Sequence, residues 1–190
     1  MMAHHPSRVA LAIPSWLNAR LAALDQSVRT GDENQMEFVL DLAGENSRRG
    51  GGPFAAAIFT DAGELVAAGV NRVVPDSAPI AHAEIVAIAA AGQRLGTWNL
   101  RSVGALTLVS STEPCAMCLG AVPWSGVRSL VIGARDADAR SAGFDEGNKP
   151  DDWSDHLASL GIDVRVDVLR GAAAAVLAEY AASGGPIYNG

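Results

Sequence analysis

The stretch ALTLVSSTEPCAMCLGAVPWSGVRSLVIGA, residues 105–134, holds a strand, a helix and a second strand in one continuous run. Ala105–Ser110 is a short apolar run with β-branched residues, which predicts a buried strand. Glu113-Pro114 leads into an apolar helix over Cys115–Trp124, and Ser129–Ala134 predicts another short buried strand. A helix between two strands packs its apolar side against one face of a sheet.

The rest of the chain continues this alternation of strands and helices. Apolar residues at helical spacing predict helices from Asp32 to about Arg49, over Ala81–Leu95 and over Ala172–Ala182. Further strands are predicted at Phe54–Thr60, at Leu65–Asn71 after an Asp61-Ala62-Gly63 turn, and at Ile162–Leu169, where apolar and charged residues alternate. Residues 135–155 are polar and predict a loop. The pattern predicts an α/β fold with three layers, α/β/α, around one five-stranded sheet.

By composition the chain divides into three parts. We expect an N-terminal arm at residues 1–31, a main domain at 32–183 and a C-terminal tail at 184–190. No apolar stretch approaches the roughly 20 residues that cross a bilayer. Pro14 interrupts the apolar start, so we expect no signal peptide. The only two cysteines form one C-x-x-C, which favours a reducing compartment, and we expect the cytoplasm.

The charge balance bears on the class of partner. The 190 residues carry 14 basic and 21 acidic side chains, a net charge of −7. A polynucleotide binder needs a basic surface to neutralise phosphates, and no such cluster is present in the sequence. We therefore expect a small uncharged or cationic substrate, no nucleic acid and no membrane.

Two short motifs at predicted helix starts carry groups that bind metal and move protons. His82-Ala83-Glu84 begins one helix, and Cys115 and Cys118 begin the next. The cysteines are three positions apart and share a helix face, where the positive end of the helix dipole favours thiolates. One imidazole and two thiolates leave one of the four positions of zinc for water, which is typical of a catalytic site. Glu84 is then the candidate for taking a proton from that water.

Two interpretations from other classes remain open at this point. A thiol–disulfide oxidoreductase would use Cys115 and Cys118 as a redox pair, which leaves His82-Ala83-Glu84 without a role. A noncatalytic, zinc-stabilised binding module would need a fourth protein ligand. His156 is the remaining candidate for that ligand, and it lies in a polar segment where exposure is expected.

The order H-x-E and then P-C-x-x-C is the signature of zinc nucleobase deaminases. Over a longer span the chain resembles the bacterial guanine deaminases of the cytidine-deaminase fold, most closely those that also accept the s-triazine ammeline. The resemblance is strongest over residues 50–147 and rests on Gly51-Gly52-Pro53-Phe54, Asn71, Ala81-His82-Ala83-Glu84, Glu113–Ala121, Trp124 and Gly143–Gly147. It implies a mixed sheet, zinc as cofactor and a homodimer. In this group the C-terminal tail covers the pocket, in some members from the partner subunit.

The resemblance also implies the reaction, which is hydrolysis of guanine to xanthine and ammonia. Glu84 would move a proton to the ring, and Glu146 would be a second carboxylate that helps carry a proton to the leaving amine. Without the resemblance, a glutamate in a polar loop is expected to be a solvated charge. For the homodimer, Val122, Trp124 and Val127 are the expected apolar face.

A planar, neutral purine needs an apolar slot with a few fixed polar groups. Phe54 and Trp124 are candidates for the faces of that slot, and Asn71 is the candidate for its polar edge because an amide both donates and accepts. Ala83 and Tyr188 complete the predicted substrate-binding residues. The sequence equally allows Phe54 and Trp124 in the core or at a dimer contact, and Asn71 as the cap of a turn.

Other substrates of the same chemistry stay open as well. Cytosine, cytidine and guanosine would need only small changes of pocket, because fold does not fix substrate. The tRNA adenosine deaminases share much of the region around Pro114–Cys118, but they need a basic surface for RNA that this composition lacks.

Overall fold

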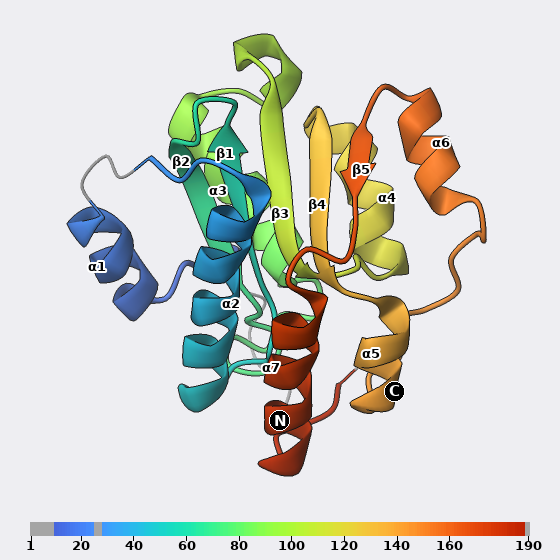
Figure 1. The fold of residues 1–190 in the computed structure, drawn as a ribbon. Coiled ribbons are helices and arrows are strands. Elements are labelled where there is room, and N and C mark those ends of the chain that lie inside the picture. Colours follow the sequence, from blue (N-terminus) through green and yellow to red (C-terminus); the bar gives the residue numbers. More distant parts are fainter. Residues whose placement is uncertain (1–9, 25–27, 189–190) are drawn as a thin grey trace, which may run out of the picture.

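The computed structural model describes residues 10–24 and 28–188 and shows one five-stranded sheet between two layers of helices (Figure 1). The strands are β1 (Ala55–Thr60), β2 (Leu65–Val70), β3 (Leu106–Thr112), β4 (Ser129–Ala134) and β5 (Asp163–Arg165). The helices are α1 (Ser15–Ala23), α2 (Asp32–Arg48), α3 (Ala83–Leu95), α4 (Ala116–Ser125), α5 (Asp136–Ser141), α6 (Trp153–Ser159) and α7 (Arg170–Ala182), with a short 3-10 turn at Leu100–Val103. Residues 1–9 and 25–27 of the predicted arm and 189–190 of the predicted tail lie outside the described residues.

The sheet is mixed, in the order β2-β1-β3-β4-β5. β1 pairs antiparallel with both β2 and β3, whereas β3, β4 and β5 run parallel to one another. The helix α4 connects the parallel neighbours β3 and β4, as a crossover between parallel strands requires. The predicted three-layer fold with a five-stranded mixed sheet is confirmed.

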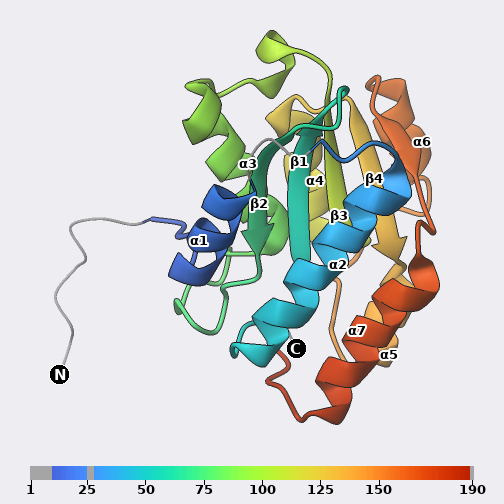
Figure 2. The ribbon, with the colours of Figure 1, turned by 60° about the vertical axis from the view of Figure 1, so that its left-hand side comes forward.

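Each face of the sheet has its own hydrophobic core. On one face α2 and α7 lie side by side, and their Met36, Leu42 and Leu177 are almost fully buried (Figure 2). On the other face α3, α4 and α6 cover Ile58 and Leu108 of the sheet. The fold therefore rests on small and aliphatic side chains, in line with an aromatic content of only 5%.

The position of α3 depends on a glycine in β2. A Cβ atom at Gly69 would lie 2.3 Å from the carbonyl oxygen of Ala83 and 2.5 Å from the amide nitrogen of Ala87. Because glycine has no side chain, the first turn of α3 lies directly on the strand. This close contact fixes the end of α3 that carries His82 and Glu84.

Two elements in the C-terminal third differ from the prediction. Residues 135–155 are not all loop, because α5 and the start of α6 lie there. Asp138 caps α5 by accepting the Arg135 amide over 2.7 Å. Because Ala139 is the one residue of α5 that is buried, the sequence of this helix shows no apolar stripe. The strand predicted at Ile162–Leu169 is only three residues long, because Asp167 and Leu169 have positive φ angles of 64° and 53°.

The N-terminal helix α1 packs on the same core as α2. Its Leu17 is fully buried, and Arg20 forms an ion pair with Glu45 of α2 over 2.7 Å. Nowhere in residues 10–24 and 28–188 does the chain form a helix with the length and apolarity that a bilayer crossing requires.

Candidate functional site

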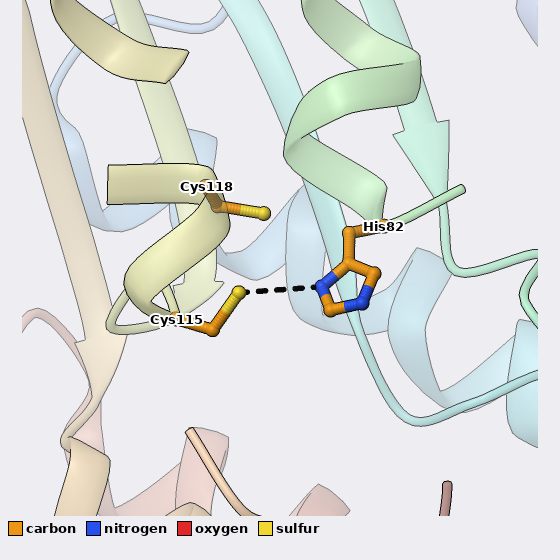
Figure 3. Close-up of side chains that lie close together, drawn as sticks. All are labelled: His82, Cys115 and Cys118. Carbon is orange, nitrogen blue, oxygen red and sulfur yellow. Dashed lines mark hydrogen bonds between the residues drawn. The ribbon is translucent and has the colours of Figure 1, made fainter. Parts of the chain in front are cut away.

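His82, Cys115 and Cys118 meet where α3 and α4 begin (Figure 3). His82 is the residue before α3, Cys115 is the residue before α4, and Cys118 lies in the first turn of α4. The Sγ atom of Cys115 lies 3.5 Å from Nδ1 of His82. One ligand atom from each of the three residues lies within 4.8 Å of the others. The structure thus brings His82 together with two cysteines that lie 33 and 36 positions further along the sequence.

These three side chains fit a zinc ion. Two sulfur atoms and an imidazole nitrogen are ligands that zinc prefers. A hydrogen bond from Cys118, together with His82, lowers the pKa of Cys115 to about 4, so that this cysteine is a thiolate at neutral pH. Within the described residues this cluster holds three ligands and no fourth, and His156 is exposed on α6. A zinc ion here keeps a coordination position free for water.

Protonation of His82 and Cys118 follows from the charges around them. Burial opposes a charge on His82, but the hydrogen bond with Cys115 and the charge of Glu84 raise the pKa of the imidazole. The neighbouring Cys115 thiolate, followed by burial, raises the pKa of Cys118. One cysteine is therefore the anion and the other the proton donor of the pair, until a metal ion replaces the proton.

Glu84 lies in the first turn of α3 and is buried. Cys118 Sγ donates to its Oε2 over 3.4 Å, so the carboxylate lies next to the metal ligands. Burial, reinforced by the Cys115 thiolate, raises the pKa of Glu84. A carboxyl group with a raised pKa beside a water-activating metal is suited to accept and return a proton.

Glu146 approaches the same cluster from the loop between α5 and α6. Only 5% of the residue is exposed, so it is not the solvated charge that its polar segment predicts by default. Its carbonyl oxygen accepts the Ala116 amide over 2.9 Å, which fixes the loop against the start of α4. Burial, with contributions from Cys115 and Glu84, raises the pKa of Glu146 to about 8.

A cavity lies between these groups. Its wall is formed by the following residues: Phe54, Asn71, His82, Glu84, Thr112, Glu113, Cys115, Glu146 and Tyr188. The cavity volume is about 20 Å³, room for about one water molecule. Tyr188 takes up much of the surrounding space, since a Cβ atom at Gly52 would lie 2.0 Å from its hydroxyl oxygen.

Asn71 is held at the cavity wall by the main chain around it. Its amide donates to the Phe54 carbonyl over 3.0 Å, and its own carbonyl accepts from Nδ2 of the buried Asn46 over 2.9 Å. Its side-chain Oδ1 also accepts the Val73 amide over 3.2 Å. Asn71 therefore caps the following turn and also lines the cavity, and its contact with a substrate stays a prediction.

Two predicted substrate-binding residues do not line the cavity. Trp124 is 86% exposed on the outer side of α4. It follows Cys118 by six positions, which is about 240° around a helix, so the two side chains point in different directions. The Ala83 side chain is fully buried in the core beneath α3. Contacts of either residue with a substrate remain predictions.

Three residues of the site were missed from the sequence. Thr112 and Glu113 line the cavity, and Lys149 forms an ion pair with Glu113 over 2.7 Å. Only the last of them carried a signal, because Lys149 is the single lysine of the chain and lies in the segment of Glu146.

The chain is similar to known deaminases. Residues 29–134 match the family model described as the cytidine and deoxycytidylate deaminase zinc-binding region. A guanine deaminase of Bacillus subtilis (strain 168) is 40% identical over 115 residues, which are 60% of this chain and 71% of that protein.

Solved structures extend the similarity to nearly the whole chain. That of guanine deaminase from Nitrosomonas europaea is 45% identical, with a TM-score of 0.88, and the match covers 95% of this chain and 100% of that one. A structure in complex with 2,6-diaminopurine is 48% identical, with a TM-score of 0.87, over 95% of this chain and 97% of that one.

The raised pKa of Glu146 predicts how the stability of the zinc-free protein depends on pH. Its pKa is about 8 in the folded state, against 4.5 in the unfolded chain, so between these values the folded protein binds more protons. The free energy of unfolding therefore falls as the pH rises from about 5 to about 8. Glu146→Gln, which does not titrate, removes this part, of the order of 1–4 kcal/mol. Urea unfolding of both proteins in chelator at several pH values measures it. Parallel pH profiles would contradict a buried, protonated Glu146.

Proposed function

This chain belongs to the cytidine and deoxycytidylate deaminase family with its zinc-binding region, and from its site we propose that it hydrolyses guanine to xanthine and ammonia. It is a zinc-dependent hydrolase of the deaminase type. The observation that carries the proposal is the cavity itself. There the buried Glu84 lies beside His82 and the two cysteines, and Asn71 and Phe54 offer a polar and an apolar wall.

Zinc, when bound, supplies Lewis-acid activation of water at neutral pH. Glu84 accepts the proton of the attacking water and delivers it to a ring nitrogen, for which N3 is the candidate in guanine. Glu146 then transfers a proton to the amine, the bond between carbon and amine breaks as that carbon becomes a carbonyl, and the hydroxyl proton returns to the carboxylates as ammonia leaves. The two carboxyls suit these roles, because burial raises both pKa values, that of Glu146 to about 8, and a carboxyl with a raised pKa can both accept and return a proton.

Recognition of the base falls to the walls of the cavity. The side-chain amide nitrogen of Asn71 is the proposed donor for an acceptor atom on the purine edge, and the Phe54 ring is the candidate for a stacking face. The s-triazine ammeline is a planar ring with exocyclic amine and oxygen groups, and we propose it as a second substrate. A local cavity of about 20 Å³ is smaller than either ring, so we infer that Tyr188 moves aside for the substrate and then covers it.

The two thiols bear on the cellular compartment that we propose for the protein. Cys115 and Cys118 bind a metal only in the reduced state, which favours the cytoplasm as the compartment in which the protein works. A disulfide exchange function is the competing use of the same pair, and one zinc ion per chain in the purified protein would exclude it.

The substrate is tested by ammonia release from zinc-loaded protein. Guanine, ammeline, guanosine, cytosine, cytidine and adenine are compared side by side at equal concentration. We expect release from guanine, and from ammeline at a lower or equal rate, since both present an amine on a planar ring small enough for a closed cavity. Release from cytosine or cytidine alone would overturn the proposed substrate and keep the zinc chemistry. No release from any compound would overturn the proposed reaction.

The proton-transfer role of Glu84 is tested by Glu84→Ala. This variant lacks the acid–base group but keeps all three metal ligands, so we expect one zinc per chain, a folded protein and a turnover rate lower by roughly 10²–10⁴-fold or more. Zinc is measured by mass spectrometry of the metal and turnover by ammonia release. Glu37→Ala, at an exposed position of α2, is the control and keeps wild-type activity. Wild-type turnover in Glu84→Ala would remove Glu84 from the mechanism.

We propose a homodimer whose face keeps Trp124 of the three residues that the sequence indicated, but not Val122 and Val127. Val122 and Val127 are fully buried in the core, so they cannot contact a partner. Trp98 and Trp124 are 89% and 86% exposed and border one surface hollow together with Leu160. Large exposed aromatic side chains that gather in one place are typical of an interaction surface.

Sedimentation velocity tests this assembly. We expect the wild-type chain to sediment as a dimer and Trp98→Ser/Trp124→Ser as a monomer, because the substitutions remove the aromatic contacts. A wild-type monomer at micromolar concentration would contradict the proposal, whereas a dimer in both proteins would place the interface elsewhere.

A further inference from the structure

Lys149, the only lysine of the chain, is buried among acceptors beside the site. Its side chain is 7% exposed, and its Nζ lies 2.7 Å from Glu113 Oε1 and 2.8 Å from Asp136 Oδ1. The same ammonium donates to the carbonyl oxygen of Pro114 over 3.1 Å. Two of these contacts, to Glu113 and Pro114, are hydrogen bonds, and the third, to Asp136, is an ion pair.

Two of these acceptors, Glu113 and Pro114, lie across the contact between the Glu146 loop and the start of α4, which we call the seam, whereas the third, Asp136, is the first residue of α5. Glu113 and Pro114 form the link between β3 and α4, immediately before the metal ligand Cys115. Lys149 belongs to the loop between α5 and α6, three residues after Glu146. The ammonium therefore joins the loop that carries Glu146 to the segment that carries Cys115.

Main-chain contacts also hold the Glu146 loop against the start of α4 at this seam. The Ala116 amide donates to the carbonyl oxygen of Glu146 over 2.9 Å. One residue further on, Gly147 has a φ of 72°, and a Cβ atom there would lie 2.9 Å from the Cβ of Ala116. The loop is thus in direct contact with the first turn of α4, and a small shift of the loop displaces Glu146.

Charge explains why a lysine is needed at this place. Glu113 is a buried carboxylate and Asp136 a partly buried one. Glu113 also lines the cavity whose wall includes Glu84 and Glu146. A buried carboxylate without a cation is costly, whereas one that is paired and hydrogen-bonded keeps a fixed geometry. Glu113 Oε1 accepts from Lys149 over 2.7 Å and its Oε2 accepts the Asp136 amide over 3.4 Å, so each carboxylate oxygen has a donor.

We propose that Lys149 is a positioning residue of the deamination reaction, which holds the Glu146 loop against the start of α4 so that the Glu146 carboxyl faces the substrate. The inference rests on the proposed function and adds a residue to it. Lys149 touches neither the substrate nor the metal ligands, and it acts through Glu113, Pro114 and the loop. Its removal displaces Glu146 and leaves His82, Cys115 and Cys118 in place.

Two variants test this inference. Lys149→Met removes the cation and leaves Glu113 buried and unpaired, which endangers folding. Glu113→Gln/Lys149→Met removes both charges of the pair, and Asp136 keeps its ion pair with Arg140. Arg170→Met is the matched control, because Arg170 forms an exposed ion pair with Asp138 away from the seam.

We expect the folded, zinc-loaded variants to lose kcat by roughly 10- to 100-fold, the effect of a small misplacement of a reacting group. KM stays within about threefold, because Asn71 and Phe54 remain in place, and zinc stays at the wild-type ratio. Arg170→Met keeps the wild-type kcat. Wild-type kcat in the folded double variant would overturn the inference, and so would a loss of zinc that matches the loss of kcat. If guanine is not turned over, the same ratios are measured with the substrate that is.

A further test uses the wild-type protein, so it depends neither on the identity of the substrate nor on whether the variants fold. With ε-¹⁵N-lysine the chain gives a single side-chain signal, and the buried ammonium is expected to exchange its protons slowly enough to be observed. Hydrogen exchange by mass spectrometry is expected to show protection of the peptides around Ala116 and Glu146. A rapidly exchanging ammonium, or no protection of these peptides, would show that the seam is open and that Lys149 does not hold it.

Discussion

The direction of β2 and β3 is the constraint on which the site depends. Both strands are antiparallel to β1, so their carboxyl ends meet at one edge of the sheet, and α3 and α4 begin there. His82 and Cys115 occupy the extended residue just before each helix, with ψ angles of 154° and 170°. Ligands at such positions are fixed by the sheet and the helices together. The distance between imidazole and thiolate is therefore set by strand pairing and not by a mobile loop.

The pKa values of the acids gathered at this edge are shifted in opposite directions. The positive ends of two helices and the Cys118 hydrogen bond stabilise a thiolate at Cys115. Burial, reinforced by that thiolate, raises the pKa values of Glu84 and Glu146. His82 and the cysteines are thus suited to bind a cation, whereas the environment of the two carboxyls favours their protonated form. Titratable groups whose environments move their pKa values apart are typical of acid–base catalysis.

The sequence predicted the features that depend on local spacing. Short motifs at helix starts hold the metal ligands and Glu84, and apolar runs mark the strands of the sheet. Both could therefore be predicted from the sequence alone. Features that depend on contacts between distant segments were not. The polar helix α5 shows no apolar stripe, and Trp124 lies in an apolar helix whose rotation places it outside. Nothing in the sequence pairs Lys149 with Glu113, because 36 positions separate them.

Residues 135–155, whose sequence shows the weakest pattern, are attached to the site by ion pairs. Residues 135–155 have little apolar surface to bury, and their contacts with the site run through Lys149, Asp136 and the main chain of Glu146. Buried ion pairs contribute little net stability compared with apolar packing, but they permit only a narrow range of geometries. Such a segment can therefore carry a proton-transferring carboxyl with the precision of the helix-borne ligands, although it is a loop. The same reasoning predicts that substitutions in this segment alter turnover before they alter folding, whereas substitutions in the β2–α3 contact around Gly69 alter both.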